Sequence, residues 1–253
     1  MFLPRVIPVL LLKGKGLVKT VRFKDPKYIG DPINAVKIFN DKRADELVFL
    51  DINASKENRL ISLDFVHKVG DEANMPFAVG GGIKTIQDIR SILENGAEKV
   101  VINTAAYENP EFIKEAVDAF GSSTIAVCLD VKKNFFGKLQ LVYKQGAKNA
   151  KEDPVEFAQK MEENGTGEII IQSVDKDGTY EGYNIELIKL ISKAVTIPVV
   201  ALGGASKYDD FSLAVKQGFA SAVAAGSLFV YHGPRRAVLI SFPTKTEIVD
   251  IFK

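Results

Sequence analysis

The chain has 253 residues, of which 46% are hydrophobic and 26% are charged, and 33 Lys and Arg against 32 Asp and Glu leave a net charge of +1. This composition predicts a globular protein with a large core. The absence of a long basic or acidic run argues against nucleic acid and against a membrane as partners.

An apolar run near the N-terminus is too short to span a bilayer. It also lacks the length and the cleavage site of a secretory signal, so we expect a cytoplasmic protein. The single cysteine, Cys128, has no intrachain partner for a disulfide and lies within an apolar run, which favours a buried and inert thiol.

Short apolar, β-branched runs follow one another along the chain, and each predicts a β-strand. They cover residues 6–12, 47–52, 77–79, 99–103, 124–130, 168–172, 199–202 and 222–226. Amphipathic segments of helix length separate them, such as IQDIRSILENG ending at Gly96 and NIELIKLISKA opening on Asn184. Alternating strands and helices predict a parallel sheet, and eight such units predict one (βα)8 TIM barrel domain covering residues 1–253. An open doubly wound sheet is the alternative, but no G-x-G-x-x-G opens the first βα turn.

The chain also repeats itself at a constant offset. DELVFLD from Asp45 resembles GEIIIQS from Gly167 (167 − 45 = 122), and MPFAVGGGIKT from Met75 resembles IPVVALGGASK from Ile197 (197 − 75 = 122). The repeat predicts two fused half-barrels, of about residues 1–121 and 122–253. Alternating segments at residues 17–23 and 134–146 predict hairpins over the top of the barrel.

Glycines and small polar residues follow the third, fourth, seventh and eighth predicted strands. Barrel enzymes place their sites at the carboxyl ends of the strands, and backbone N–H groups in such loops can hold a phosphate. The candidates are Gly80, Gly81, Gly82, Asn103, Thr104, Gly203, Gly204, Gly226 and Ser227. Their paired placement predicts two phosphate sites on opposite sides of the barrel mouth, although tight turns alone would require similar glycines.

Three aspartates, Asp51, Asp130 and Asp177, lie at or just beyond the second, fifth and sixth strands. A carboxylate there can act as a general acid or base, whereas most strand-end aspartates cap a turn. Asp130 ends an apolar run, where an uncompensated charge is costly, so we predict a catalytic role for it. For the first strand of each half the offset is 119, since VLLLK ending at Lys13 resembles VCLDVK ending at Lys132 (132 − 13 = 119). The counterpart of Asp130 in the other half-barrel (130 − 119 = 11) is therefore Leu11.

Four charged residues near the amino ends of the strands predict an ionic ring that closes the barrel bottom. They are Arg5, Glu46, Lys99 and Glu168. His67 falls on a helical pattern and His232 in a turn. With two histidines and one cysteine in the chain, we expect neither a metal site nor a cofactor.

The motifs RVIPVL, DELVFLDI, FAVGGGI, EKVVINTAA, GEIIIQSVDKDGT and GGA resemble, in this order, those of the cyclase subunit of imidazole glycerol phosphate synthase. The resemblance covers essentially the whole chain. It implies a phosphorylated substrate that spans both phosphate sites, with Lys19, Asp51, Asn103, Thr104, Asp177 and Gly178 among its contacts. It also implies a glutaminase at the barrel bottom, beside Glu98, and an ammonia channel for which the ionic ring is the gate.

The chain departs from the family at the mouth. Leu11 stands in place of a second catalytic aspartate, Gln172 at a Thr-type position and Leu202 at a Ser-type position beside a phosphate. Losing one of two acid–base carboxylates should slow a reaction by about 10²- to 10⁴-fold. We therefore expect a barrel that conducts ammonia without cyclase activity of its own.

Paralogues of the cyclase subunit that are encoded with surface polysaccharide genes resemble such a barrel. The C-terminal tail of this chain, residues 233–243, is similar to the tail of those paralogues. That resemblance implies a separate sugar amidotransferase as a partner, which amidates an N-acetyl sugar in lipopolysaccharide biosynthesis. Two alternatives remain open. One is an active cyclase (lyase) of histidine biosynthesis, and the other is a non-catalytic scaffold that binds phosphate.

Overall fold

A closed barrel of parallel strands forms the centre of the computed structural model, which describes residues 3–233 and 235–253. One position of the tail segment 233–243 therefore lies outside the described residues. The barrel strands are β1 (Arg5–Lys13), β4 (Leu47–Asp51), β5 (Phe77–Gly80), β6 (Lys99–Ile102), β7 (Ile125–Lys133), β10 (Glu168–Ser173), β11 (Val199–Leu202) and β12 (Ala222–Ala225). Each pairs with the next, and β12 returns to β1, so the predicted (βα)8 barrel is confirmed.

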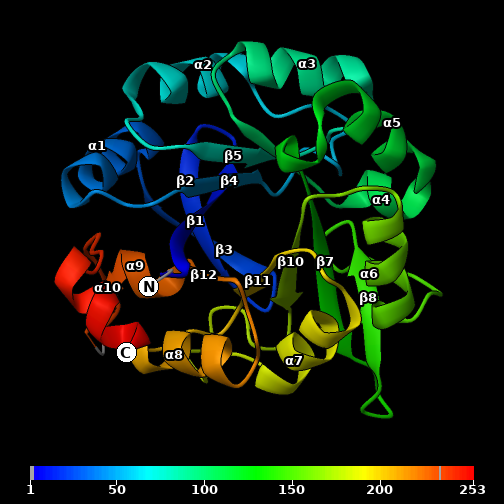
Figure 1. Cartoon of the computed structure of the whole chain (residues 1–253). Helices are drawn as coiled ribbons and strands as arrows, with labels where there is room; N and C mark the ends of the chain where they lie inside the picture. Colours follow the sequence, from blue (N-terminus) through cyan, green and yellow to red (C-terminus); the bar gives the residue numbers. More distant parts are fainter. Residues whose placement is uncertain (1–2, 234) are drawn as a thin grey trace.

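Helices surround the barrel, as Figure 1 shows in a view along the barrel axis. The outer helices are α1 (Pro32–Lys42), α2 (Leu63–Glu72), α3 (Ile86–Glu94), α5 (Glu111–Phe120), α6 (Pro154–Glu163), α7 (Ile185–Ala194), α8 (Tyr208–Lys216) and α10 (Lys245–Phe252). The short helices α4 (Thr104–Glu108) and α9 (Ser227–Val230) directly follow β6 and β12, with the 3-10 turn η1 (Ser122–Thr124) before β7. Local signals set the helix starts: the Asn184 side chain accepts from the Leu187 N–H at the start of α7.

Hairpins are present at both predicted places, but each extends beyond the predicted residues, to Gly30 and to Asn149. β2 (Gly16–Val21) and β3 (Lys24–Gly30) fold back antiparallel beside β1, and β8 (Leu139–Tyr143) and β9 (Lys148–Asn149) follow β7. β7 continues to Lys133 instead of ending at Asp130, because β8 pairs with its last residues. A third small hairpin joins β13 (Tyr231–His232) and β14 (Ala237–Val238) in the tail.

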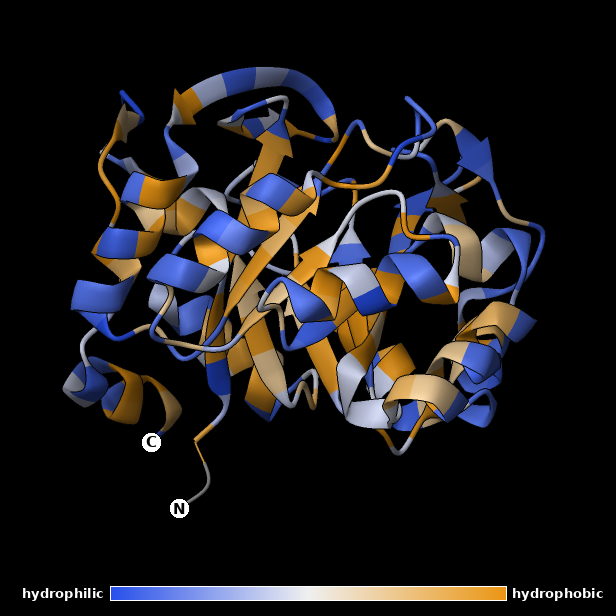
Figure 2. Cartoon of the chain, turned by 90° about the horizontal axis from the view of Figure 1, so that it is seen from above, coloured by the Kyte–Doolittle hydropathy of each residue, from blue (hydrophilic) through white to orange (hydrophobic). Residues whose placement is uncertain are grey.

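The barrel interior is a second apolar core, separate from the one between strands and helices. It consists of the inward side chains Ile7, Val9, Val48, Ala78, Val101, Ala126, Cys128, Ile170, Val200, Leu202, Ala222 and Ala224. Figure 2 shows hydrophobic residues along the strands and hydrophilic residues on the outer helices. Within residues 3–233 and 235–253, none of the helices is long and apolar enough to cross a membrane.

Candidate functional site

A cavity opens where the barrel strands reach their carboxyl ends, and we call this opening the mouth. It brings together the residues that the sequence predicts for phosphate binding and acid–base chemistry, because the loops that follow parallel strands meet at one end of a barrel. The lining includes Lys19, Asp51, Gly81, Gly82, Asn103, Thr104, Asp130, Asp177, Gly178, Gly203, Gly204, Gly226 and Ser227. The three departures Leu11, Gln172 and Leu202 also line it.

Two glycines at the mouth allow close approaches that a side chain would disturb. Gly82 has φ +73°, and a methyl group there would collide with the Arg59 carbonyl oxygen. A methyl group at Gly226 would collide with the ammonium group of Lys19. The second contact places a cation beside the loop that follows the eighth barrel strand.

Lys19 reaches the mouth from β2 with its side chain almost fully buried. Its Nζ donates to the Val9 carbonyl oxygen at 2.6 Å. Burial lowers the pKa of Lys19 to about 8, although the nearby Asp177 carboxylate opposes the shift. Lys19 is therefore mostly a cation at neutral pH, and among the described residues no carboxylate forms a direct ion pair with it, which suits the binding of an anion.

Asp130 extends into the mouth from β7, and only 8% of its surface is exposed. Asn103 Nδ2 donates to Asp130 Oδ2 at 3.1 Å, and Cys128 Sγ lies 3.6 Å from Oδ1. Burial raises the pKa of Asp130 to about 7, against the opposing hydrogen bonds from Cys128 and Asn103. Near neutral pH the carboxyl group therefore exists in both protonation states, as a general acid or base requires. Burial also raises the pKa of the Cys128 thiol well above its usual value, which fits an inert thiol.

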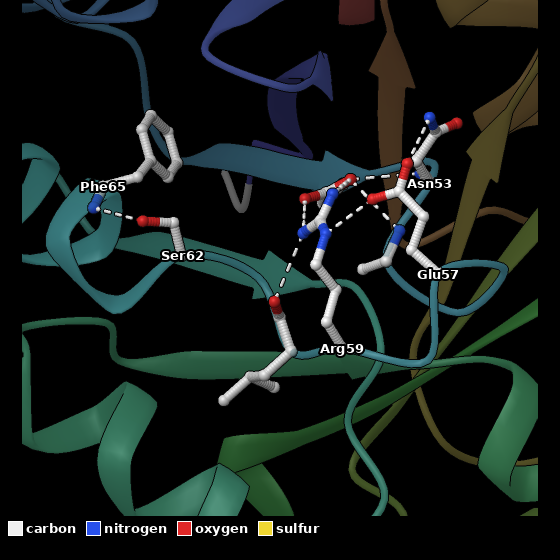
Figure 3. Close-up of polar contacts among 8 residues, drawn as sticks. Asn53, Glu57, Arg59, Ser62 and Phe65 are labelled. Carbon is white, nitrogen blue, oxygen red and sulfur yellow. Dashed lines mark hydrogen bonds and ion pairs between the residues drawn. The ribbon is translucent and has the colours of Figure 1, made fainter.

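Asp51 has partners that the sequence did not reveal. Arg59 donates to both of its carboxylate oxygens, at 2.6 Å and 3.3 Å, and Asp51 Oδ1 also accepts from the N–H groups of Asn53 and Ala54. Figure 3 shows the guanidinium of Arg59 held beside Glu57 as well. Asp51 thus caps the turn after β4, the alternative that strand-end aspartates most often follow.

Asp177 binds the β2–β3 hairpin to the loop that follows β10. It accepts from Thr20 Oγ1 at 2.9 Å, and its backbone oxygen accepts from the Arg22 N–H at 2.9 Å. Burial raises the pKa of Asp177, while the hydrogen bond from Thr20 and the charge of Lys19 oppose the rise. These contacts hold the β2–β3 hairpin over the loop after β10, and the aspartate remains within the lining of the mouth.

The four residues of the ionic ring meet at the amino ends of the strands. Arg5 contacts both Glu46 and Glu168, and Lys99 Nζ lies 2.8 Å from Glu168 and 3.3 Å from Glu46. The two carboxylates raise the pKa of Arg5 although burial, the largest single effect, acts against them. Each cation therefore bridges both anions, and the ring spans the barrel bottom.

The two histidines lie away from the mouth. His67 faces Asp71 on the outer surface of α2, and His232 is an exposed residue of β13. In the part of the chain that the structure describes, no group of three or more His, Cys, Asp or Glu residues is placed to hold a metal ion.

Comparison with known proteins relates nearly the whole chain to one family. Residues 5–234 match the family model described as histidine biosynthesis protein. The chain is 47% identical over 239 residues to a Pseudomonas aeruginosa protein provisionally named imidazole glycerol phosphate synthase subunit hisF2, covering 94% of this chain and 95% of that protein. It is 43% identical over 232 residues to imidazole glycerol phosphate synthase subunit HisF of Alkaliphilus metalliredigens, covering 92% of each chain. The identity to the protein of that name from Pyrococcus furiosus is 45% over 228 residues, 90% of each chain.

Proposed function

The chain belongs to the histidine biosynthesis protein family, and we propose that it is a synthase subunit that carries ammonia through its barrel to a phosphorylated acceptor at the mouth. The observation that carries this proposal is the layered interior. Along β10 the inward residues are Glu168, Ile170 and Gln172, from the ionic ring through the apolar core to the mouth. Neutral ammonia crosses such an apolar space far more easily than a charged ion does.

A glutaminase docked on the amino ends of the strands would supply the ammonia. The names of the relatives describe each of them as a subunit. On this chain the exposed Glu98 lies next to Lys99 in the sequence, and the Arg5 side chain is 34% exposed. Contact with a partner at these residues could open the ionic ring, because its ion pairs compete with any new hydrogen bonds to the same groups.

The names of the relatives favour the cyclase (lyase) reaction of histidine biosynthesis as the chemistry at the mouth. Those reported above refer to imidazole glycerol phosphate synthase, and none of them refers to polysaccharides. The histidine pathway, an alternative in our sequence analysis, is therefore better supported than sugar amidation. In this reading Lys19 and the loop glycines hold the phosphates, and Asp130 moves the proton.

A second candidate has one specific observation in its favour. Leu11 faces the mouth where the family resemblance implies a carboxylate, and Leu202 lies beside Gly203 in the proposed phosphate loop. Such a barrel could bind a phosphorylated ligand and release ammonia to a separate sugar amidotransferase without cyclising anything itself. No observation favours the third possibility, a scaffold without chemistry.

Turnover of the cyclase substrate, phosphoribulosyl formimino aminoimidazole carboxamide ribotide, distinguishes the two candidates. Purified protein with excess ammonium at alkaline pH needs no glutaminase, so turnover would establish the cyclase reading. No turnover, together with glutaminase binding that Lys99→Met or Glu98→Lys weakens, would support the second candidate. Absence of both turnover and glutaminase binding would overturn the proposal of an ammonia-conducting synthase subunit.

A further inference from the structure

Gln172 carries a buried acceptor that nothing in the described chain satisfies. The residue is 4% exposed, it lines the mouth, and its Oε1 has no hydrogen-bond partner among residues 3–233 and 235–253. A buried acceptor without a partner costs about 1–3 kcal/mol, and such groups in native proteins usually have a specific reason. The other end of the amide is engaged, because a hydrogen bond from Gln172 helps to lower the pKa of Asp177.

The position of Gln172 defines what can reach this oxygen. On β10 it pairs in register with Asp130 of β7 on one side and with Leu202 of β11 on the other. Ile170, the preceding inward residue, belongs to the apolar interior. The oxygen therefore stands at the top of the apolar interior, beside a carboxyl group that is itself 8% exposed.

We propose that Gln172 Oε1 and the Asp130 carboxylate form a docking subsite for one molecule of ammonia at the upper end of the barrel interior. This inference rests on the proposed function and deepens it. Ammonia has three N–H donors, so it can donate to both oxygens while its lone pair remains free for the acceptor in the mouth. The register places the two acceptors on neighbouring strands, which suits a ligand of this size.

The surroundings disfavour anions and larger amines at this subsite, and the titration described below separates ammonia from water. A phosphate oxygen would meet two acceptors and no donor, which is repulsive. A larger amine would meet the hydrocarbon side chain of Leu202, which pairs in register with Gln172 and lines the same mouth. Ammonium would have no counter-charge in the apolar interior below the subsite, so neutral ammonia is the form that reaches the subsite through the barrel.

Titration of the isolated barrel tests this inference without any glutaminase or substrate. The carboxamide carbons of all glutamines are labelled with ¹³C, and the Gln172 signal is identified by its absence from Gln172→Met. Ammonium chloride is added at constant ionic strength, and tetramethylammonium chloride, which has no N–H donor, serves as the control salt. We expect a saturating shift of the Gln172 signal with ammonium alone, while the signal of Gln145, another residue of the mouth, stays in place.

The dependence on pH identifies the bound species. Between pH 7.5 and 8.5 the midpoint in total ammonium should fall by about tenfold, since the neutral fraction grows in that proportion. Asp130→Asn should weaken the response, and Gln145→Met, a matched change at the rim, should leave it unchanged. An unmoved signal, or an equal shift with tetramethylammonium, would overturn the subsite. Neither of these two results would affect the tests of glutaminase binding and cyclase turnover, which examine the proposed function independently.

Discussion

Leu11 and Asp130 line one cavity from opposite sides of the barrel, on β1 and β7. Four strand steps separate these strands in either direction around the barrel, so a hydrocarbon faces a carboxyl group across the mouth. Of the aspartates there, Asp51 is held by Arg59 and Asp177 by Thr20. We therefore expect Asp130 to be the carboxyl group that moves a proton, with a hydrocarbon and no second carboxyl group opposite it.

Introducing that second carboxylate should raise the cyclase rate. In the presence of ammonium, Leu11→Asp should turn over the cyclase substrate at least about 10²-fold faster than the wild type, because one acid–base group contributes about 10²–10⁴. Steady-state rates at alkaline pH measure the effect. Leu50→Asp is the matched control, since Leu50 pairs with Leu11 in register and also lines the mouth. An equal gain from both variants would show that charge alone, without placement, explains the change.

Asp130 should make stability depend on pH. Its pKa is about 7 in the folded protein, against an ordinary aspartate value of 3.8, so the folded state binds more protons between these values and stability falls as pH rises through them. Asp130→Asn has no carboxyl group at this position, so its stability does not fall with pH for this reason. The free energy of unfolding of the variant minus that of the wild type should therefore increase from pH 4 to pH 8, by at most about 4 kcal/mol.

Urea unfolding of the wild type and Asp130→Asn at several pH values measures this difference. Asp118→Asn, a change on the outer helix α5, is a control that should show no comparable trend. A constant difference between wild type and Asp130→Asn over the whole range would mean that the carboxyl group titrates normally.

The fold was predictable because each barrel element carries a local signal. Buried strands such as residues 168–172 read as apolar runs, and the start of α7 at Asn184 follows from a cap and a helical period. The residues of the mouth were predictable for a related reason, since the carboxyl ends of parallel strands must meet. The duplication into two half-barrels and the role of each residue stay predictions.

Contacts between loops could not be read from the sequence. Arg59 lies eight residues after Asp51, and Thr20 is 157 residues from Asp177, yet these pairs determine how free each carboxylate is. No periodic pattern encodes the meeting of two side chains from different segments of the chain. The same holds for Gln172, whose unpaired oxygen depends on which end of its amide faces Asp177.

The ionic ring should contribute to stability as well as closing the barrel. Lys99→Met leaves Glu46 and Glu168 with Arg5 as their remaining partner in the ring, and a mostly buried anion without its cation is costly. We expect the free energy of unfolding to fall by about 1–3 kcal/mol in urea denaturation. Lys68→Met breaks the exposed pair with Asp64, whose side chains are 60% and 74% exposed, and should cost no more than about 0.5 kcal/mol. If both variants lost the same free energy of unfolding, the ion pairs of the ring would contribute no more to stability than an exposed ion pair does.

Anion binding at the mouth should depend on the space that Gly226 leaves for Lys19. Because a methyl group at position 226 would occupy the place of the Lys19 ammonium, Gly226→Ala should weaken the binding of glycerol phosphate by about tenfold or more, the value of one charged hydrogen bond. Lys19→Met should cause a similar loss, and the double variant should add little, since both changes remove one contact. In the wild type the affinity should fall as pH rises past about 8, where burial makes Lys19 lose its proton. Calorimetric titration from pH 6.5 to 9.5 measures both effects. If Gly226→Ala bound glycerol phosphate like the wild type, the cation that holds the phosphate would have to be another residue.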